Sequence, residues 1–434
     1  MVTTMNHALT RLSLKWGSLT RRALMRGALA AILAAGVLPG CAHTSKKSLN
    51  AYASWSAAPQ DYTEPFLPAQ PPLAFNNQTL RQVLRVAIGG DQVRVRFSNL
   101  FGKAPITISG AHIARSTGGS SIEPASDTEL KFNGQSSVTI PAGGELWSDA
   151  AALKVPALGT LAVSMFLATE TPVATVHTLG LQTNYVAAGN ALSQETLEGA
   201  ETRSSYYFLS GVDVLTAAKA NVVVAIGDSL TDGAGTTPDT DNRWTNSLAR
   251  RLQADTSAGA VSVVNAGILG GRIASHGIGP KGIDRFERDV LGQSGASHVI
   301  VLLGINDIAF PAFAPNQEVT DDQITAGMQS MIDKAKARGL KVLVGTLLPF
   351  KGATVLGQPY YSEEFERRRQ VFNAWIRSNS AIDHVIDFEQ AVRDPANPLV
   401  LLPDYDSGDH LHLNDKGAEA MAKAVELSLL KVQQ

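Results

Sequence analysis

The sequence has a single cysteine, Cys41, among 434 residues. The folded part of the chain therefore cannot contain a disulfide bond, and a zinc site built from several cysteines is excluded. A strong charge bias is also missing, since the formal net charge is −2, so nothing favours a nucleic-acid partner. No group of histidine, cysteine and aspartate has metal-ligand spacing, and no glycine-rich phosphate loop occurs. We expect neither a metal nor a cofactor.

Acidic residues are absent before Asp61, whereas arginine and lysine are frequent there. An apolar run at residues 28–38 is too short to span a bilayer but has the length of the hydrophobic part of a signal peptide. The segment Thr20-Arg21-Arg22 resembles the start of a twin-arginine export signal. Arginine pairs are also common in ordinary basic leaders, so both the twin-arginine and the general export route stay open.

The apolar run ends in Leu38-Pro39-Gly40-Cys41, which resembles a bacterial lipobox, although Pro39 is unusual at its position. In a lipobox the cysteine becomes the lipidated first residue of the mature protein. The alternative is an ordinary signal peptide whose cleavage leaves a free thiol, but the position of the one cysteine favours lipidation. We expect residues 1–41 to be a signal peptide. The mature protein would then be periplasmic or cell-surface, anchored at Cys41 and touching the membrane only through that lipid.

Small polar residues at 42–54 predict a tether, and residues 55–215 predict an all-β sandwich or jelly-roll domain made of short, turn-bounded strands. Two of these strands, at 83–88 and 93–97, flank Gly89-Gly90-Asp91 and read as a hairpin. Arg94 and Arg96 alternate with apolar residues, which favours a solvated sheet face over a site for an anion or a sugar. His177 reads as a packed residue.

From residue 220 to 434 strands and helices alternate, which predicts a three-layer α/β/α domain around a five-stranded parallel sheet. The expected strands are at 222–226, 260–264, 298–303, 341–346 and 384–386, and the expected helices at 243–254, 282–291, 321–338, 363–378 and 415–431. The carboxyl ends of parallel strands meet at one edge of the sheet, where such folds bind their ligands. Catalytic residues of such a domain are therefore expected directly after its strands.

Four polar clusters lie at strand ends or in the last loop: Gly227-Asp228-Ser229-Leu230, Asn265-Ala266-Gly267-Ile268-Leu269-Gly270-Gly271, Gly304-Ile305-Asn306-Asp307 and Asp409-His410-Leu411-His412. In this order and spacing they resemble the SGNH, or GDSL, hydrolases, from about Asn221 to the end of the chain. The β-rich region resembles a domain that precedes the catalytic one in some members of a branch associated with plant-polysaccharide-degrading proteins.

The resemblance implies a catalytic triad of Ser229, Asp409 and His412. A serine hydroxyl needs an adjacent base to act as a nucleophile, and that base needs a carboxylate on its other nitrogen. Asp409 lies three residues before His412 and can reach the same ring across a tight turn. His410 is the rival base, in which case Asp406 would be the carboxylate. Asp228 reads as structural.

The resemblance also implies an oxyanion hole formed by the backbone N–H groups of Ser229 and Gly270 and by the side chain of Asn306. Gly271 directly follows Gly270, so the assignment within this pair stays open. Asp307 reads as a brace for the turn at Asn306.

These residues predict a serine esterase that hydrolyses short-chain acyl esters through an acyl-enzyme, with acetyl groups on a polysaccharide as the favoured substrate. Alternatives are an acyltransferase with the same triad, a lipase or lysophospholipase-type acylhydrolase, and a non-catalytic surface-binding lipoprotein. Four aromatic residues should border the crevice, where they could stack on a sugar, line an acyl pocket or simply pack: Phe310, Phe313, Tyr360 and Tyr361. The sequence carries no signal for an oligomeric state.

Overall fold

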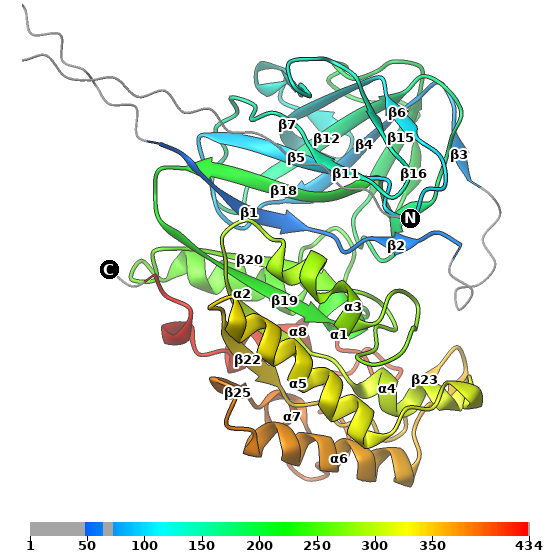
Figure 1. The fold of residues 1–434 in the computed structure, drawn as a ribbon, viewed down its shortest axis with the longest axis vertical. Helices are drawn as coiled ribbons and strands as arrows, with labels where there is room; N and C mark the ends of the chain where they lie inside the picture. Colours follow the sequence, from blue (N-terminus) through cyan, green and yellow to red (C-terminus); the bar gives the residue numbers. More distant parts are fainter. Residues whose placement is uncertain (1–47, 64–72, 433–434) are drawn as a thin grey trace, which may run out of the picture. The chain divides into compact units, whose positions relative to one another are not determined.

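The computed structural model describes residues 48–63 and 73–432 of the chain (Figure 1). The expected signal peptide and Cys41 lie outside these residues. The expected tether is too long at its carboxyl end, because strand β1 already begins at Asn50 and pairs with β18. Within the described ranges, no helix has both the length and the apolar character needed to cross a membrane.

The β-rich region consists of antiparallel sheets, as predicted. A four-stranded sheet has the order β1-β18-β5-β11 (Asn50–Ser56, Leu209–Thr216, Gln92–Ser98, Glu145–Trp147). A seven-stranded sheet has the order β16-β15-β4-β12-β7-β8 (Glu201–Arg203, Asn184–Ala188, Gln78–Arg85, Thr160–Leu167, Gly110–Gly118, Ser121–Ile122), with β9 (Thr128–Glu129) beside β7. Apolar residues of both sheets, including Val95 of β5 and Val163 of β12, form one buried core.

Smaller sheets complete this region. The three-stranded one has the order β17-β14-β2 (Tyr206–Tyr207, Thr175–His177, Gln60–Asp61). Two-stranded pairs are formed by β10 with β6 (Val138–Ile140, Ile106–Ile108) and by β13 with β3 (Thr171–Pro172, Ala74–Phe75).

The hairpin expected around Gly89-Gly90-Asp91 is wrong. Strand β4 belongs to the seven-stranded sheet and β5 to the four-stranded one, so the chain crosses between sheets at this point. Gly90 forms a bridge with Val155, and a Cβ on Gly89 would lie 2.4 Å from the Val155 carbonyl oxygen. The two glycines thus allow close packing against another segment rather than a two-strand turn.

The solvated face expected for Arg94 and Arg96 is wrong for Arg96 and holds only in part for Arg94, whose side chain is 30% exposed. Arg96 is 8% exposed, and Arg94 donates two hydrogen bonds to Asp213, at 2.9 and 2.7 Å. Both guanidinium groups lie over the ring of Trp147, at 4.5 and 5.3 Å from its centroid. Period-two alternation correctly marks two faces of a strand, but it does not reveal that a second layer of side chains covers the charged face.

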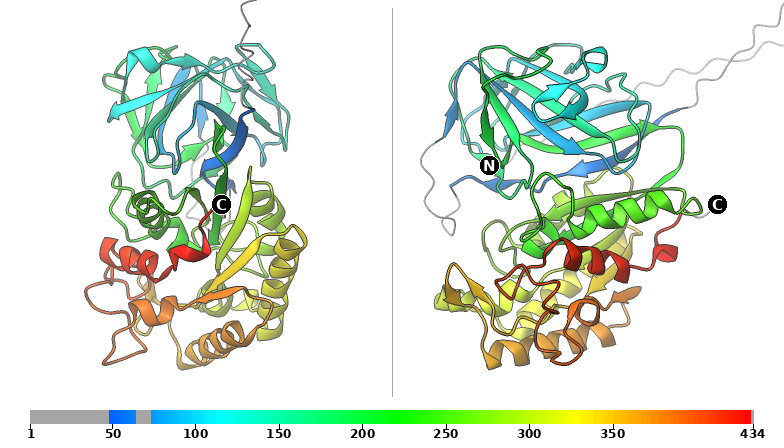
Figure 2. Two further views of the ribbon diagram at one scale, coloured as in Figure 1. Left: turned by 90° about the vertical axis from the view of Figure 1, so that its left-hand side faces the viewer. Right: turned by 180° about the vertical axis from the view of Figure 1, so that it is seen from behind.

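The parallel sheet is confirmed, with the order β20-β19-β21-β22-β25 (Ala260–Gly267, Ala220–Gly227, Ala296–Leu302, Lys341–Gly345, His384–Ile386). The helices are α1 (Ser229–Asp232), α2 (Trp244–Ala254), α3 (Gly282–Phe286), α4 (Ile305–Ala309), α5 (Asp321–Ala337), α6 (Glu363–Ser378), α7 (Phe388–Val392) and α8 (Asp415–Ala424). Helices α2, α7 and α8 contact one another on one face of the sheet, and α3, α5 and α6 cover the other (Figure 2). The last helix is shorter than expected, since α8 ends at Ala424. A short antiparallel pair, β23 with β24 (Thr354–Val355, Gln358–Pro359), lies between β22 and α6.

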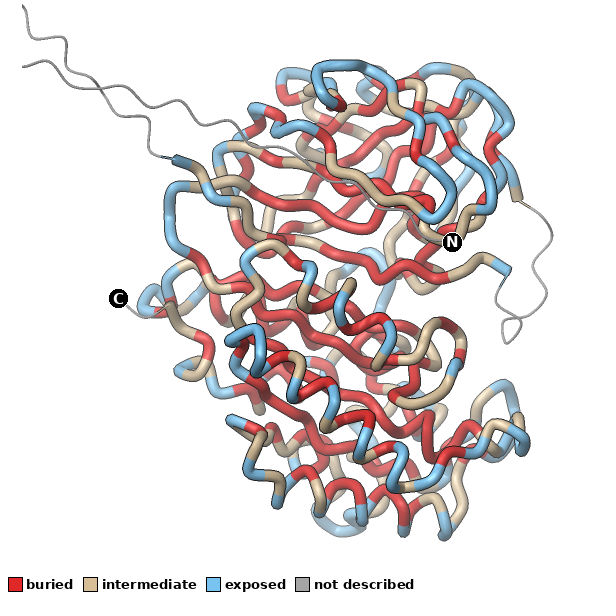
Figure 3. The backbone as a smooth tube through the Cα atoms, in the orientation of Figure 1, coloured by how far each residue is buried: buried red, intermediate tan, exposed pale blue. Residues whose placement is uncertain are grey.

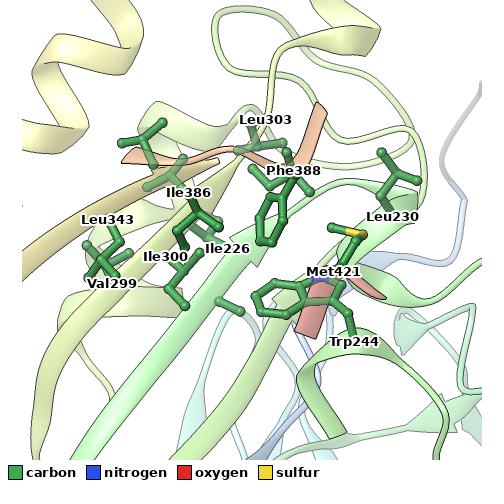
Figure 4. Close-up of a cluster of buried hydrophobic side chains, with 14 of the residues drawn as sticks. Ile226, Leu230, Trp244, Val299, Ile300, Leu303, Leu343, Ile386, Phe388 and Met421 are labelled. Carbon is green, nitrogen blue, oxygen red and sulfur yellow. The ribbon is translucent and has the colours of Figure 1, made fainter. Parts of the chain in front are cut away.

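Strand β19 lies inside the parallel sheet, between β20 and β21. Its residues 222–226 are fully buried, and the parallel strands are buried along most of their length (Figure 3). Figure 4 shows the packing around Ile226, where the rings of Trp244 and Phe388 lie 5.6 Å apart. Each large apolar side chain buried in this way contributes about 1.5–3 kcal/mol. This core fixes the carboxyl end of β19, where Ser229 follows.

Candidate active site

Ser229 lies at the turn from β19 into α1. A Cβ on Gly227 would lie 2.1 Å from the Thr231 hydroxyl oxygen, so only glycine allows the chain to turn this sharply. The Asp228 side chain then caps the helix by accepting a hydrogen bond from the Leu230 backbone N–H at 3.0 Å. The result is a buried serine, 5% exposed, held on rigid elements beside the carboxyl ends of the strands.

Residues 402–414, which we call the histidine loop, bring His412 and Asp409 to this serine. One oxygen of Asp409 accepts the backbone N–H groups of Leu411 and His412, at 3.0 and 2.8 Å. The other lies 2.6 Å from His412 Nδ1, and His412 Nε2 lies 2.8 Å from Ser229 Oγ. Although burial opposes it, the hydrogen bonds from the imidazole and the two backbone groups hold the pKa of Asp409 well below its usual value. An ionised Asp409 accepts a hydrogen bond from the Nδ1–H group of His412. The Nε2 lone pair of His412 then faces the serine hydroxyl.

His410 points elsewhere. Its Nδ1 lies 2.5 Å from Asp406 Oδ2, and its side chain is 56% exposed. The segment is a tight turn rather than an extended strand, and His410 adopts a left-handed backbone conformation (φ 60°) that directs its ring away.

Residues 268–281, which we call the glycine loop, follow β20 and border the same serine. Gly270, with φ 67°, lines the cavity beside Ser229, and a Cβ there would lie 2.8 Å from the Ile278 side chain. The Gly271 N–H instead donates to the Ile268 carbonyl at 2.8 Å. Of the two glycines that the sequence left open, Gly270 is thus the one that faces the serine.

Asn306, in the first turn of α4, lines the same cavity and contacts this loop directly. Its amide nitrogen donates to the Gly271 carbonyl at 3.0 Å, and its oxygen accepts the Tyr360 hydroxyl at 2.7 Å. The Tyr360 ring is buried and stacks on Phe313 at 5.2 Å. Tyr360 therefore fixes which end of the Asn306 amide faces the cavity. The sequence placed Tyr360 near the crevice but gave no signal for this contact, because the two residues are 54 positions apart.

Two buried carboxyl groups lie close to the serine. Burial raises the pKa of Asp228 to about 7 and that of Asp307 to about 6. Asp307 accepts the backbone N–H groups of Ile273 and Ala274, at 2.6 and 2.9 Å. The expected role as a local brace for Asn306 is thus wrong, since Asp307 holds the glycine loop instead.

A cavity of about 340 Å³ opens onto Ser229. Its lining is mostly apolar: Leu269, Ile278, Phe310, Phe313, Val355, Leu356, Tyr360 and Leu411. Three of the four aromatic residues singled out in the sequence are in this list. Tyr361 is not, and its ring packs against Phe350 at 5.2 Å. Among the described residues, no group of three or more histidine, cysteine or acidic side chains is arranged to hold a metal ion.

Comparison with known families gives a match between residues 225–420 and the GDSL-like lipase/acylhydrolase family, and this segment contains all four polar clusters. Three solved structures resemble the chain over 47% of its length. They are a protein assigned to the G-D-S-L lipolytic family from Desulfitobacterium hafniense (24% identity, 96% of that chain, TM-score 0.35), a GDSL-like lipase from Bacteroides thetaiotaomicron (21%, 84%, 0.35) and an acetylxylan esterase from Geobacillus stearothermophilus (20%, 91%, 0.37). A comparison with curated proteins returned no match.

Proposed function

We propose that the protein works as a serine esterase through an acyl-enzyme. It is a carboxylic ester hydrolase, since residues 225–420 match the GDSL-like lipase/acylhydrolase family. In this proposal Ser229 is the nucleophile, His412 the general base and acid, and Asp409 the group that orients the imidazole. The observation that carries the proposal is the unbroken chain of contacts from Asp409 to His412 (2.6 Å) and from His412 to Ser229 (2.8 Å).

The proposed reaction has two halves. Ser229 Oγ attacks the ester carbonyl carbon while His412 Nε2 takes the hydroxyl proton. The tetrahedral intermediate collapses, the bond to the alcohol oxygen breaks, and His412 returns its proton to that oxygen. Water then attacks the acyl-enzyme, His412 takes a proton from it, and the second collapse releases the acid and restores the serine hydroxyl. Asp409 stays ionised throughout and stabilises the imidazolium form of His412.

We assign the oxyanion hole to the backbone N–H groups of Ser229 and Gly270 and to the Asn306 amide. An amide NH₂ has two hydrogens, and the Gly271 carbonyl accepts one of those of Asn306. The second hydrogen is then the one that donates to the developing negative charge. Preorganised donors of this kind are each worth about 10²–10³ in turnover.

The proposed substrates are short-chain acyl esters, with acetylated carbohydrate as the favoured natural case. The cavity supports a second candidate, an acylhydrolase for longer chains, because its walls are apolar and Leu356 at the cavity is 85% exposed. Each methylene buried there should stabilise the transition state by about 0.8 kcal/mol, or about fourfold in kcat/KM. Hydrolysis of p-nitrophenyl esters from acetate to decanoate separates the two. An optimum at acetate supports the first candidate, and a rise of this size with each methylene supports the second.

The decisive test of the mechanism is Ser229→Ala. We expect a loss of turnover on the order of 10⁶-fold with an unchanged thermal unfolding curve. A fluorophosphonate should label the wild type at Ser229, as located by peptide mass spectrometry, and should not label the variant. Activity of the variant within tenfold of the wild type would refute the mechanism. Free acid from an ester donor in the presence of a sugar alcohol supports the hydrolase, and a new ester supports the acyltransferase.

We further propose that the protein is exported and lipid-anchored through Cys41. The basic leader without acidic residues, the short apolar run and the position of the one cysteine support this. Globomycin, which blocks lipoprotein signal cleavage, should make an uncleaved precursor accumulate. A mature, unlipidated protein that starts at another residue would contradict the proposal.

A further inference from the structure

A buried histidine of the β-rich region contacts helix α1 of the α/β domain. His177, the last residue of β14, lies with Nδ1 3.0 Å from the Ala58 carbonyl and Nε2 3.0 Å from Asp232 Oδ1. Both nitrogens thus face acceptors, an arrangement that only the doubly protonated ring satisfies. Burial alone would lower the pKa of His177, but the charge and hydrogen bond of Asp232 outweigh it and raise the pKa above its usual value. The two side chains are 6% and 2% exposed, so this is a buried ion pair.

Asp232 also contacts the glycine loop. Its second oxygen accepts the backbone N–H of Leu269 at 2.9 Å, and Leu269 immediately precedes Gly270. Asp232 itself is the last residue of α1, the helix that begins at Ser229. One carboxylate therefore joins the β-rich region, the serine helix and the residue before the proposed oxyanion donor.

A second contact holds the other end of the loop. Gln60 of β2 donates to the Ile278 carbonyl at 2.6 Å, and its oxygen accepts the backbone and hydroxyl groups of Thr178, both at 3.0 Å. Ile278 is the side chain that packs against Gly270. The β-rich region thus holds the glycine loop on both sides of Gly270, through His177 and Asp232 at Leu269 and through Gln60 at Ile278.

We propose that the β-rich region is a working part of the esterase site, in which His177 and Gln60 are positioning residues that hold the Gly270 N–H where the oxyanion forms. This inference rests on the proposed esterase mechanism. Gly270, Gly271, Gly277 and Gly279 give the loop a wide choice of backbone conformations, so external contacts must select one. An oxyanion donor has to lie about 2.7–3.1 Å from the oxygen, and a small displacement lowers the rate.

The ion pair is better explained by positioning than by stability. Burying two charges costs several kcal/mol per ion before their attraction offsets it, and apolar replacements are often equally stable. A His177–Asp232 pair fixes direction as well as distance, because the ring and the carboxylate each have two defined hydrogen-bonding positions. This directionality is what an oxyanion donor on a glycine-rich loop requires.

Two amide variants of His177 test the inference. In His177→Gln the amide nitrogen can replace Nε2 and keep the contact with Asp232, whereas in His177→Asn it can replace only Nδ1 and keep the contact with Ala58. We expect His177→Asn to lower kcat about 10- to 100-fold with KM changed by less than about threefold, because a displaced donor affects the transition state most. His177→Gln should recover most of the lost kcat. Rates are taken per active site, counted by end-point fluorophosphonate labelling, so that unfolded protein does not enter them.

The matched control is His112→Asn. His112 also lies in the β-rich region and also pairs with a carboxylate, Asp127, at 2.9 Å, but both residues belong to the β-rich region. Its kcat should stay within about twofold of the wild type, since an effect on activity requires contact with the site. Equal losses in His112→Asn and His177→Asn would overturn the inference, because the effect would then be a general loss of stability in this region.

Hydrogen–deuterium exchange provides a readout that does not depend on activity. Peptides covering residues 268–281 should exchange faster in His177→Asn than in the wild type, and less so in His177→Gln. Gln60→Met, which keeps the size of the side chain but removes its donor, should have the same effect and serves if His177→Asn does not fold. Unchanged exchange together with unchanged kcat would overturn the inference. The esterase mechanism would still stand if Ser229→Ala is inactive, and active Ser229→Ala would overturn the mechanism instead.

Discussion

The two loops that meet at Ser229 are held in opposite ways. Most side-chain hydrogen bonds of the histidine loop lie within it: Asp406 accepts the backbone N–H of Gly408, Asp409 accepts that of His412, and Asn414 donates to the Asp404 and Asp406 carbonyls. The glycine loop is held from far away in the sequence. Asp232 is 37 residues from its partner there, Asp307 is 34 and Gln60 is 218.

This difference separates two ways of building one site. A loop held by local hydrogen bonds has a geometry that depends on few other residues. Substitutions outside such a loop should therefore leave its geometry unchanged. A loop held by distant groups depends on the whole fold, so its geometry should respond to changes in α4 and in the β-rich region.

The largest effect concerns the two histidines of the histidine loop. His412→Ala should lower turnover by about 10⁴-fold or more, because it removes the base that contacts Ser229. His410→Ala should stay within about tenfold of the wild type, because its ring contacts Asp406. Steady-state hydrolysis of p-nitrophenyl acetate measures both. An active His412→Ala beside an inactive His410→Ala would transfer the proposed role to the His410–Asp406 pair.

Two carboxylates, Asp307 of α4 and Asp409 of the histidine loop, should affect stability differently as the pH changes. The pKa of Asp307 is raised to about 6, so between pH 4 and 6 the folded protein binds more protons than the unfolded chain. Its contribution to the free energy of unfolding should therefore fall by about 3 kcal/mol over this range, about 10²-fold in the unfolding equilibrium. The pKa of Asp409 is lowered, so its contribution is lost only as the pH falls below about 4.

Urea unfolding of the wild type, Asp307→Asn and Asp409→Asn at pH 4.5, 5.5 and 6.5 measures this contrast. The free energy of unfolding of the wild type minus that of Asp307→Asn should fall as the pH rises. The corresponding difference for Asp409→Asn should stay nearly constant. If the free energy of unfolding of the two variants depends on pH in the same way, Asp307 and Asp409 do not differ in their contribution to stability.

The smallest effect concerns the phenol that orients Asn306. Tyr360→Phe keeps the ring that stacks on Phe313 but removes the hydrogen bond to the Asn306 oxygen. We expect kcat to fall about tenfold with KM nearly unchanged, since the amide can then rotate away from the oxyanion. Tyr361→Phe is the control, because Tyr361 does not line the cavity, and its kcat should be unaffected. Equal effects in the two variants would show that the Tyr360 hydroxyl does not orient Asn306.

Periodicity and short motifs predicted most of the α/β domain correctly. The five strands and their parallel pairing are confirmed, because buried apolar runs and alternating helices report the local environment of each segment. The turn at Asp409 was also predictable, since Asp409 lies three positions before His412 and local hydrogen bonds close the loop. The errors occur where two distant segments meet. Examples are the crossing between sheets at Gly89 and the cover of Trp147 over Arg94 and Arg96.

Local sequence patterns were enough to predict the buried apolar strands, the helices between them and the spacing of Asp409 and His412, because each of these features depends on residues within a few positions of one another. Three contacts became visible only in the fold: Tyr360 donates to Asn306, Asp307 holds the glycine loop, and His177 contacts Asp232. A hydrogen bond between residues tens of positions apart leaves no periodic or motif signal, since its geometry comes from the packing of whole layers. The serine and its histidine could therefore be found by reading the chain, whereas the groups that hold the glycine loop could be found only in the fold.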